Sequence, residues 1–120
     1  MIVLDDLSSS DTDDLEAWCG APEPGACVEL TIEVRENGKS GVDLIYSEIR
    51  STDWDRKRSP IAVGGRIETS PLFDYSDVLA LIEGELRRAD RTDGTHEGWA
   101  ATMANLRHLG RWEFGAERSG

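Results

Sequence analysis

A strict alternation of apolar and polar side chains constrains this chain more than any other feature. It runs from Val28 to Arg35, with the apolar residues at the even positions. Period-two alternation is typical of a strand that buries one face and exposes the other. Asn37-Gly38 follows directly, and this dipeptide favours a hairpin turn. The segment therefore predicts an antiparallel hairpin with one buried side and one solvent-facing side.

A three-residue loop over 36–38 sets the predicted register of the hairpin. It places Ile32 opposite Val42, Leu30 opposite Leu44 and Val28 opposite Tyr46, so that apolar side chains meet across the strands. A two-residue loop would instead pair Ile32 with Asp43, which disfavours it. In the predicted register the solvent-facing side is acidic, with few counter-charges, and carries Glu29, Thr31, Glu33, Asp43 and Ile45.

The remaining segments surround this hairpin with further strands and helices. In chain order we expect an edge strand at 2–4, a short helix capped by Ser10, the hairpin, a strand at 61–69 with a bulge at Gly64-Gly65, a helix capped by Asp74, a helix capped by Thr95, and a short strand or clasp at Trp112. This β-α-β-β-β-α-α order predicts a single α+β domain over residues 1–120. Its antiparallel sheet of three to five strands would carry helices on one face.

The second half of the chain is expected to supply much of the core. The helix after Asp74 has apolar side chains at helical spacing along one stripe. Gly110 fits the position directly after the last helix, where glycine is common. We interpret the large aromatic residues Trp99, Trp112 and Phe114 as core, because a small domain needs them to hold its last helix.

Negative charge is concentrated at the front of the chain. Residues 1–50 contain 12 acids and 3 bases, whereas residues 51–120 contain 12 acids and 10 bases. The first cation is Arg35. A lopsided negative field attracts cationic partners and repels nucleic acid and anionic lipid surfaces. The charge therefore predicts a basic protein partner, with no nucleic acid and no membrane.

Compartment and redox state follow from simple patterns. No apolar run approaches the roughly 18 residues that a membrane helix needs, and the acidic N-terminus lacks the positive region of a secretory signal. We therefore expect a cytoplasmic protein. Cys19 and Cys27 are interpreted as partly buried thiols of a reducing cytosol, with a disulfide across the intervening turn as a minor alternative.

A search for chemistry returns no positive argument for catalysis. The sequence contains no nucleophile elbow, zinc-protease motif, phosphate loop or dinucleotide fingerprint. His96 and His108 are twelve positions apart, so one helix face does not bring them together as ligands. We therefore expect a binding protein that is not an enzyme and that uses no cofactor and no metal.

The C-terminal stretch resembles a family signature. Gly98-Trp99 lies in the last predicted helix, and Gly110-Arg111-Trp112-Glu113-Phe114 follows it. This ending is similar to that of the immunity protein 8 family of bacterial polymorphic toxin systems, whose members tend to end in a G-x-x-W helix followed by G-x-W-E-F.

Earlier segments follow the order of the same family. The similar pieces are residues 14–18 with Pro22, Thr52-Asp53-Trp54 and Phe73-Asp74-Tyr75, so the likeness spans roughly residues 14 to 114. The chain departs from the family pattern at Gly25-Ala26, where an aromatic is expected, and at Asp53, where proline is usual. The resemblance implies a small cytosolic antidote that is encoded beside a toxin and binds it tightly.

The expected function is that of an immunity protein which neutralises a basic toxin, with a nuclease as a natural candidate. The alternative is a phage-type acidic inhibitor that mimics nucleic acid and blocks a basic host protein. Either would dock through acids of the hairpin and first helix with one exposed aromatic: Asp11, Asp13, Asp14, Glu16, Glu29, Glu33, Asp43 and Trp54. For any one of these acids, a solvated surface charge is the simpler interpretation.

Overall fold

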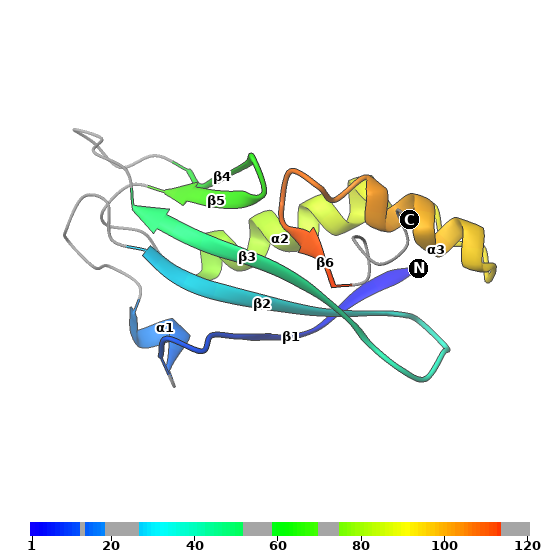
Figure 1. The fold of residues 1–120 in the computed structure, drawn as a ribbon, viewed down its shortest axis with the longest axis horizontal. Helices are drawn as coiled ribbons and strands as arrows, with labels where there is room; N and C mark the ends of the chain where they lie inside the picture. The colour runs from blue at the N-terminus through cyan, green and yellow to red at the C-terminus, as the bar shows by residue number, and fades with distance from the viewer. Residues whose placement is uncertain (13, 19–26, 52–58, 70–74, 114–120) are drawn as a thin grey trace.

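The computed structural model describes residues 1–12, 14–18, 27–51, 59–69 and 75–113. It has an α+β fold in which helices pack on a sheet (Figure 1). The predicted fold class is confirmed. The sheet differs from the prediction in two ways, because it has six strands and one of its pairs is parallel.

The strands lie in the order β1-β2-β3-β5-β4, and β6 also pairs with β3. Strand β3 pairs with β5 in parallel, whereas the other four pairs are antiparallel. The elements are β1 (Ile2–Ser8), α1 (Leu15–Trp18), β2 (Cys27–Glu36), β3 (Asp43–Ser51), β4 (Ile61–Val63), β5 (Arg66–Thr69), α2 (Tyr75–Ala89), α3 (His96–Ala104) and β6 (Arg111–Trp112).

The predicted hairpin exists, but its register is wrong by three residues. Ile32 lies opposite Ile45, and Leu30 lies opposite Ser47. The connection covers residues 37–42 and uses Gly38 and Gly41 at φ of 89° and 91°, so it is longer than the predicted loop. An odd shift turns the second strand over. Alternate residues from Ile45 therefore face the core, and the intervening ones face outward.

The predicted strand over 61–69 is two strands joined by a tight turn. Gly64 and Gly65 have φ of 63° and 84°, which suits the two-residue turns of hairpins better than a bulge. The Gly65 N–H donates to the His108 carbonyl at 3.0 Å. This bond seats the β4–β5 turn on the segment that follows α3.

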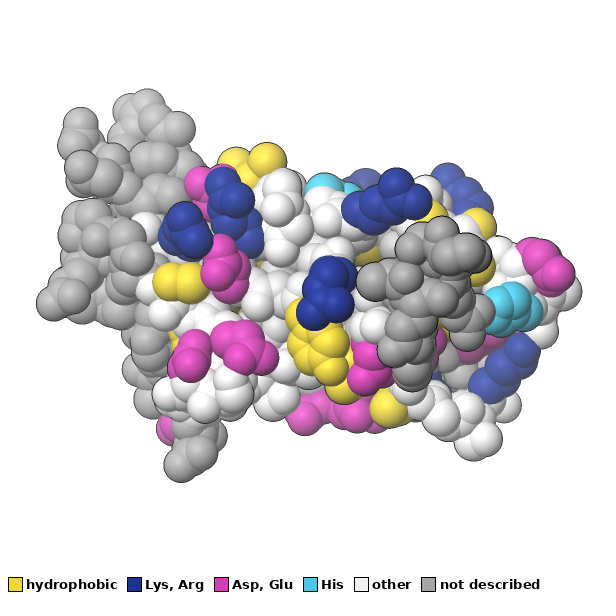
Figure 2. All heavy atoms as spheres, viewed as in Figure 1, with side chains coloured by type: hydrophobic (Ala, Val, Ile, Leu, Met, Phe, Trp, Pro, Cys, Tyr) yellow, Lys and Arg dark blue, Asp and Glu magenta, His cyan; other side chains and the backbone are white. Residues whose placement is uncertain are grey.

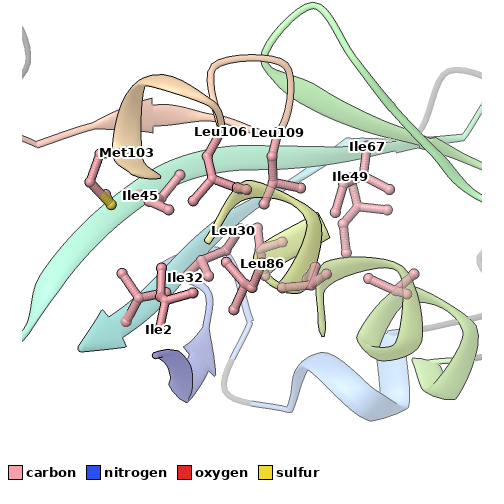
Figure 3. Close-up of a cluster of buried hydrophobic side chains, with 14 of the residues drawn as sticks. Ile2, Leu30, Ile32, Ile45, Ile49, Ile67, Leu86, Met103, Leu106 and Leu109 are labelled. Atoms are coloured by element: carbon pink, nitrogen blue, oxygen red, sulfur yellow. The ribbon is translucent and has the colours of Figure 1, made fainter. Parts of the chain in front are cut away.

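One apolar cluster joins the helices to the sheet (Figure 3). The predicted stripe of α2 is confirmed, because Val78, Ile82 and Leu86 are buried. Leu15 of α1 is also buried. The fully buried side chains of the cluster come from β2, β3, β5, α2 and the segment after α3: Val28, Leu30, Ile32, Val34, Ile45, Ile49, Ile67, Val78, Ile82, Leu106 and Leu109.

Gly110 has a different role from the predicted one. Helix α3 already ends at Ala104, so Gly110 is not the glycine that follows a helix. It lies against β3 instead, where an added Cβ would come within 2.6 Å of Ile45 Cγ2 and 2.7 Å of the Tyr46 carbonyl. Glycine is present here because two backbones approach closely.

Two of the three predicted N-caps lie in the described residues, and their outcomes differ. Thr95 caps α3 as expected, because its Oγ1 accepts from the Gly98 N–H at 3.1 Å. Ser10 does not cap α1, which begins five residues later at Leu15. The Ser10 hydroxyl donates to the Glu29 carboxylate instead. The predicted cap Asp74 lies outside the described residues.

Trp99 and Trp112 are half-buried and pack against the core cluster, in agreement with their predicted role. Phe114 and Cys19 lie outside the described residues. Cys27 carries a free thiol and is exposed, so the prediction of a partly buried thiol is wrong for this residue.

Candidate protein-binding face

The helices pack on one face of the sheet, and the opposite face carries the candidate site. We call it the outer face and define it by the outward positions of the strands. Figure 2 shows acidic and basic side chains interspersed over it, with apolar side chains between them. Its acids come from β1, β2, β3, β5 and the end of β6: Asp6, Glu29, Glu33, Glu48, Glu68 and Glu113.

The strand register brings acids together in pairs. Glu29 of β2 lies directly opposite Glu48 of β3, and Asp6 of β1 lies directly opposite Glu33 of β2. Residues directly opposite each other share a face, and like charges in such positions destabilise a sheet. The register thus places two like-charge pairs on the outer face.

Tyr46 stands among these acids. It lies opposite Thr31, and the Arg111 guanidinium carbon is 5.3 Å from the centre of its ring. Its hydroxyl donates to Glu113 Oε2 at 3.3 Å. Partial loss of hydration, together with the Glu113 carboxylate, raises the pKa of Tyr46 above its ordinary value. The hydroxyl therefore stays protonated, which leaves an aromatic ring with a donor at its tip.

Arginines neutralise part of the outer face and leave part of it charged. Arg50 Nη2 lies 2.9 Å from Glu48 Oε1, and Arg66 Nη2 lies 3.5 Å from Glu68 Oε2. Arg35 pairs with Asp5 at the sheet edge. Within the described ranges no Lys or Arg forms an ion pair with the three remaining acids of the two pairs: Asp6, Glu29 and Glu33.

Three predicted site residues lie together. Glu29 and Glu33 are on the outer face, and Asp11 Oδ2 accepts from the Glu29 N–H at 2.7 Å. Asp14 and Glu16 are exposed at and just before α1. Asp13 and Trp54 lie outside the described residues.

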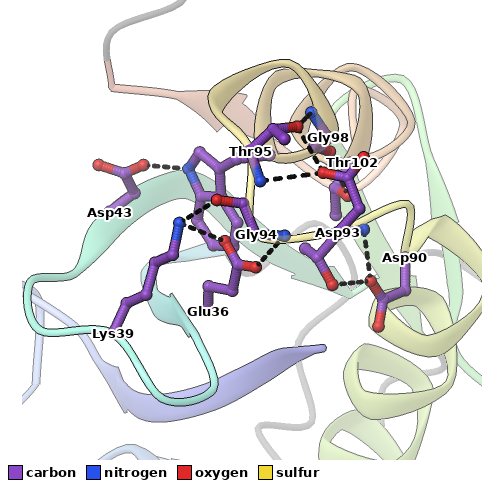
Figure 4. A network of polar contacts seen from close by, with 11 residues as sticks. Glu36, Lys39, Asp43, Asp90, Asp93, Gly94, Thr95, Gly98 and Thr102 are labelled. Carbon is purple, nitrogen blue, oxygen red and sulfur yellow. Dashed lines mark hydrogen bonds and ion pairs between the residues drawn. The ribbon is translucent and has the colours of Figure 1, made fainter.

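Asp43 is not part of the outer face, so its predicted position is wrong. The true register places it opposite Val34, which is on the core side. Its carboxylate accepts from the Trp99 indole N–H. This bond belongs to a network that ties the hairpin tip to the start of α3 (Figure 4). In the same network the buried Glu36 carboxylate accepts from the Gly94 N–H at 3.0 Å and pairs with Lys39.

Sequence reasoning missed Asp6, Tyr46, Glu48 and Arg111. Tyr46 was assigned to the buried side because the assumed connection was too short. The available signal was Gly41, a second glycine that lengthens the connection beyond Gly38. Asp6 and Arg111 lie on strands that neighbour the hairpin, so only the order of the strands in the sheet shows that they belong to the outer face.

The described residues show no arrangement typical of catalysis or metal binding. No group of three His, Cys, Asp or Glu side chains among them is placed to hold a metal ion. Although Cys27 is exposed as a residue, partial loss of hydration around its sulfur, and then the neighbouring Glu48 carboxylate, raises the pKa of the thiol, which disfavours the nucleophilic thiolate. His108 Nε2 lies 2.6 Å from Glu85 Oε2 on the helical side.

Comparison with known proteins gives no assignment, because no family model, curated protein or solved structure matches the chain. The helices in the described ranges are all too short or too polar to cross a lipid bilayer.

Proposed function

We propose that this chain is a non-catalytic immunity protein that acts in the bacterial cytoplasm and neutralises a cognate basic toxin, for which a nuclease is a natural candidate. The outer face binds the toxin. The observation that carries the proposal is the pairing of Glu29 with Glu48 and of Asp6 with Glu33 around Tyr46. The similarity of the C-terminal segment to the immunity protein 8 family supports the same function.

The energetic argument starts from the cost of the acid pairs in the free chain. A like-charge pair costs about 0.2–1 kcal/mol in a sheet, and Arg50 already offsets part of this cost for Glu29 and Glu48. A partner that places Lys or Arg between the paired carboxylates removes this repulsion and adds attraction. The repulsion is thus relieved in the complex and remains in the free protein, so it favours binding.

Tyr46 and Arg111 supply the second element of an interface. Tyr and Arg are enriched among the few residues that dominate binding energy, usually near the centre of the contact. Here the ring is already held by Arg111 and Glu113, so little side-chain freedom is lost on binding. Acids that speed the encounter therefore surround an ordered anchor that prolongs the complex.

Co-expression with the protein encoded beside this chain tests the function. We expect rescue from its toxicity and co-purification of the two chains. A neighbour that is not toxic, together with capture of a DNA- or RNA-binding host protein, would favour the nucleic-acid mimic and overturn the immunity assignment.

A charge-reversal pair tests the surface. The double variant Glu29→Lys/Glu33→Lys should slow association with the toxin about tenfold or more at low salt and weaken its salt dependence. The matched control is Glu83→Lys/Glu97→Lys, which makes the same change in net charge at exposed positions of α2 and α3. Equal slowing by both double variants would show that only net charge matters and would remove the outer face from the proposal.

A further inference from the structure

A hollow of about 430 Å³ lies between α3 and β6, at the border of the sheet. Its wall is mostly apolar: Ala100, Met103 and Ala104 come from α3, and Trp112 comes from β6. Arg107 and Arg111 also line it. This volume is within the range of small-molecule sites, about 300–1,000 Å³.

The charge of this hollow is opposite to that of the molecule. The chain has 24 acids and 13 Lys and Arg residues, yet among the described residues Arg107 and Arg111 are the only charged side chains that line the hollow. Two other hollows have mixed linings. The one at the hairpin tip includes Glu36 and Lys39, and the one along α2 includes Asp77 with two arginines.

The guanidinium groups of Arg107 and Arg111 have N–H donors that can bind an anion. Arg111 stacks on Tyr46, a contact that leaves its N–H donors available. Among the described residues, no Asp or Glu forms an ion pair with Arg107 or Arg111. A carboxylate matches such planar, forked donors in geometry and charge, as a phosphate also does.

We propose that this hollow binds a small aliphatic carboxylate. The alkyl chain lies against Met103, Trp112 and the small side chains of α3, and the carboxylate lies at the guanidinium groups. Ala100 and Ala104 leave room that a larger side chain would fill. The argument for this hollow does not rest on toxin binding, although Arg111 belongs both to the hollow and to the outer face.

Titration of the isolated protein with octanoate tests the proposal, with amide chemical shifts as the readout at about 0.15 M salt, where charges beyond roughly 8 Å are screened. Saturable shifts are expected at Ala100, Ala104 and Gly110. Octan-1-ol and octylammonium serve as ligands of the same chain length that are neutral and cationic. Both should bind more weakly than octanoate.

Two variants locate the site. Arg107→Gln should weaken octanoate about fivefold, the scale of one partly exposed ion pair, while octan-1-ol should be unaffected. Ala100→Leu should block both ligands, whereas Ala101→Leu, at an exposed neighbouring position outside the hollow, should block neither. Absence of saturable shifts, shifts outside the hollow, or equal affinity for octanoate and octan-1-ol would each overturn the proposal. Loss of binding in Ala100→Leu counts as evidence for the site only if the rest of its amide spectrum matches that of the parent protein. If the spectrum differs, the test rests on Arg107→Gln.

Discussion

The two faces of the sheet are built from the same strands but contribute very differently to the stability of the fold. On the helix-covered face, Leu30 and Ile32 have no exposed surface. On the outer face, the neighbouring Glu29 and Thr31 are partly exposed. Burying one such aliphatic side chain contributes about 1.5–3 kcal/mol, whereas a like-charge pair costs about 0.2–1 kcal/mol. A well-packed core therefore lets the opposite face keep charges that weaken the free protein.

The largest expected effect comes from the covered face. Ile32→Ala should lower the free energy of unfolding by about 2–5 kcal/mol, because it leaves a cavity at a fully buried position. Thr31→Ala is the matched control on the neighbouring residue of β2, and it should cost no more than about 1 kcal/mol, the scale of its cross-strand pair with Tyr46. Urea denaturation measures both. Similar losses in the two variants would erase the contrast between the faces.

A middle-sized effect is expected at Asp90, which holds the start of β1 on the covered side. Its Oδ2 accepts from the Ile2 N–H at 3.2 Å, and its Oδ1 accepts from the Thr92 N–H at 2.9 Å. Partial burial alone would raise the pKa of Asp90, but the bonds from Thr92 and Ile2 outweigh it and lower the pKa below the ordinary value.

The sign of the pH dependence follows from that lowered pKa. The charged carboxylate stabilises the fold above its unfolded pKa, near pH 4, and this contribution is lost as the pH falls through the folded pKa. Asp90→Asn should cost about 1 kcal/mol at pH 7 and should make the loss of stability below pH 4 shallower. The control Glu83→Gln, at an exposed position of α2, should leave the acid limb unchanged in urea melts collected from pH 2 to pH 7. An acid limb that Asp90→Asn does not alter would remove this carboxylate from the linkage.

The smallest effect, of opposite sign, is expected on the outer face. Asp6→Asn removes the repulsion with Glu33 and should stabilise the free protein by about 0.2–1 kcal/mol, less at high salt. Asp5→Asn, one residue earlier, removes the pair with Arg35 and should instead destabilise slightly. Thermal melts at low salt and at 1 M salt compare the two. If Asp6→Asn also destabilises, the proposed strain on the outer face does not exist.

Sequence patterns predicted the elements better than their pairing. The alternation of β2, the stripe of α2 and the Thr95 cap are local signals, and each is confirmed. The register of β3 was not predictable in the same way. Val42, Leu44, Ile45 and Tyr46 place apolar groups at both odd and even positions, so either face could have been chosen as the buried one. The length of the connection decides the register, and length is a property of the folded hairpin.

The candidate site depends on that register. Glu29 and Glu33 were placed on the outer face because β2 alternates by itself, whereas Asp43 was misplaced because its side depends on the partner strand. The structural role of Gly110 also depends on its contact with another strand, so the sequence alone did not predict it. A glycine ten residues before the end of the chain looks the same whether it follows a helix or touches another backbone.

The close approach at Gly110 bears on how this chain can diverge in evolution. The charged outer face is free to change, since its side chains support little of the fold. The crossing of two backbones at Gly110 has no such freedom, because any side chain there would collide with β3. Distant homologues should therefore share a glycine before their final aromatic strand even when their acidic residues have drifted beyond detection.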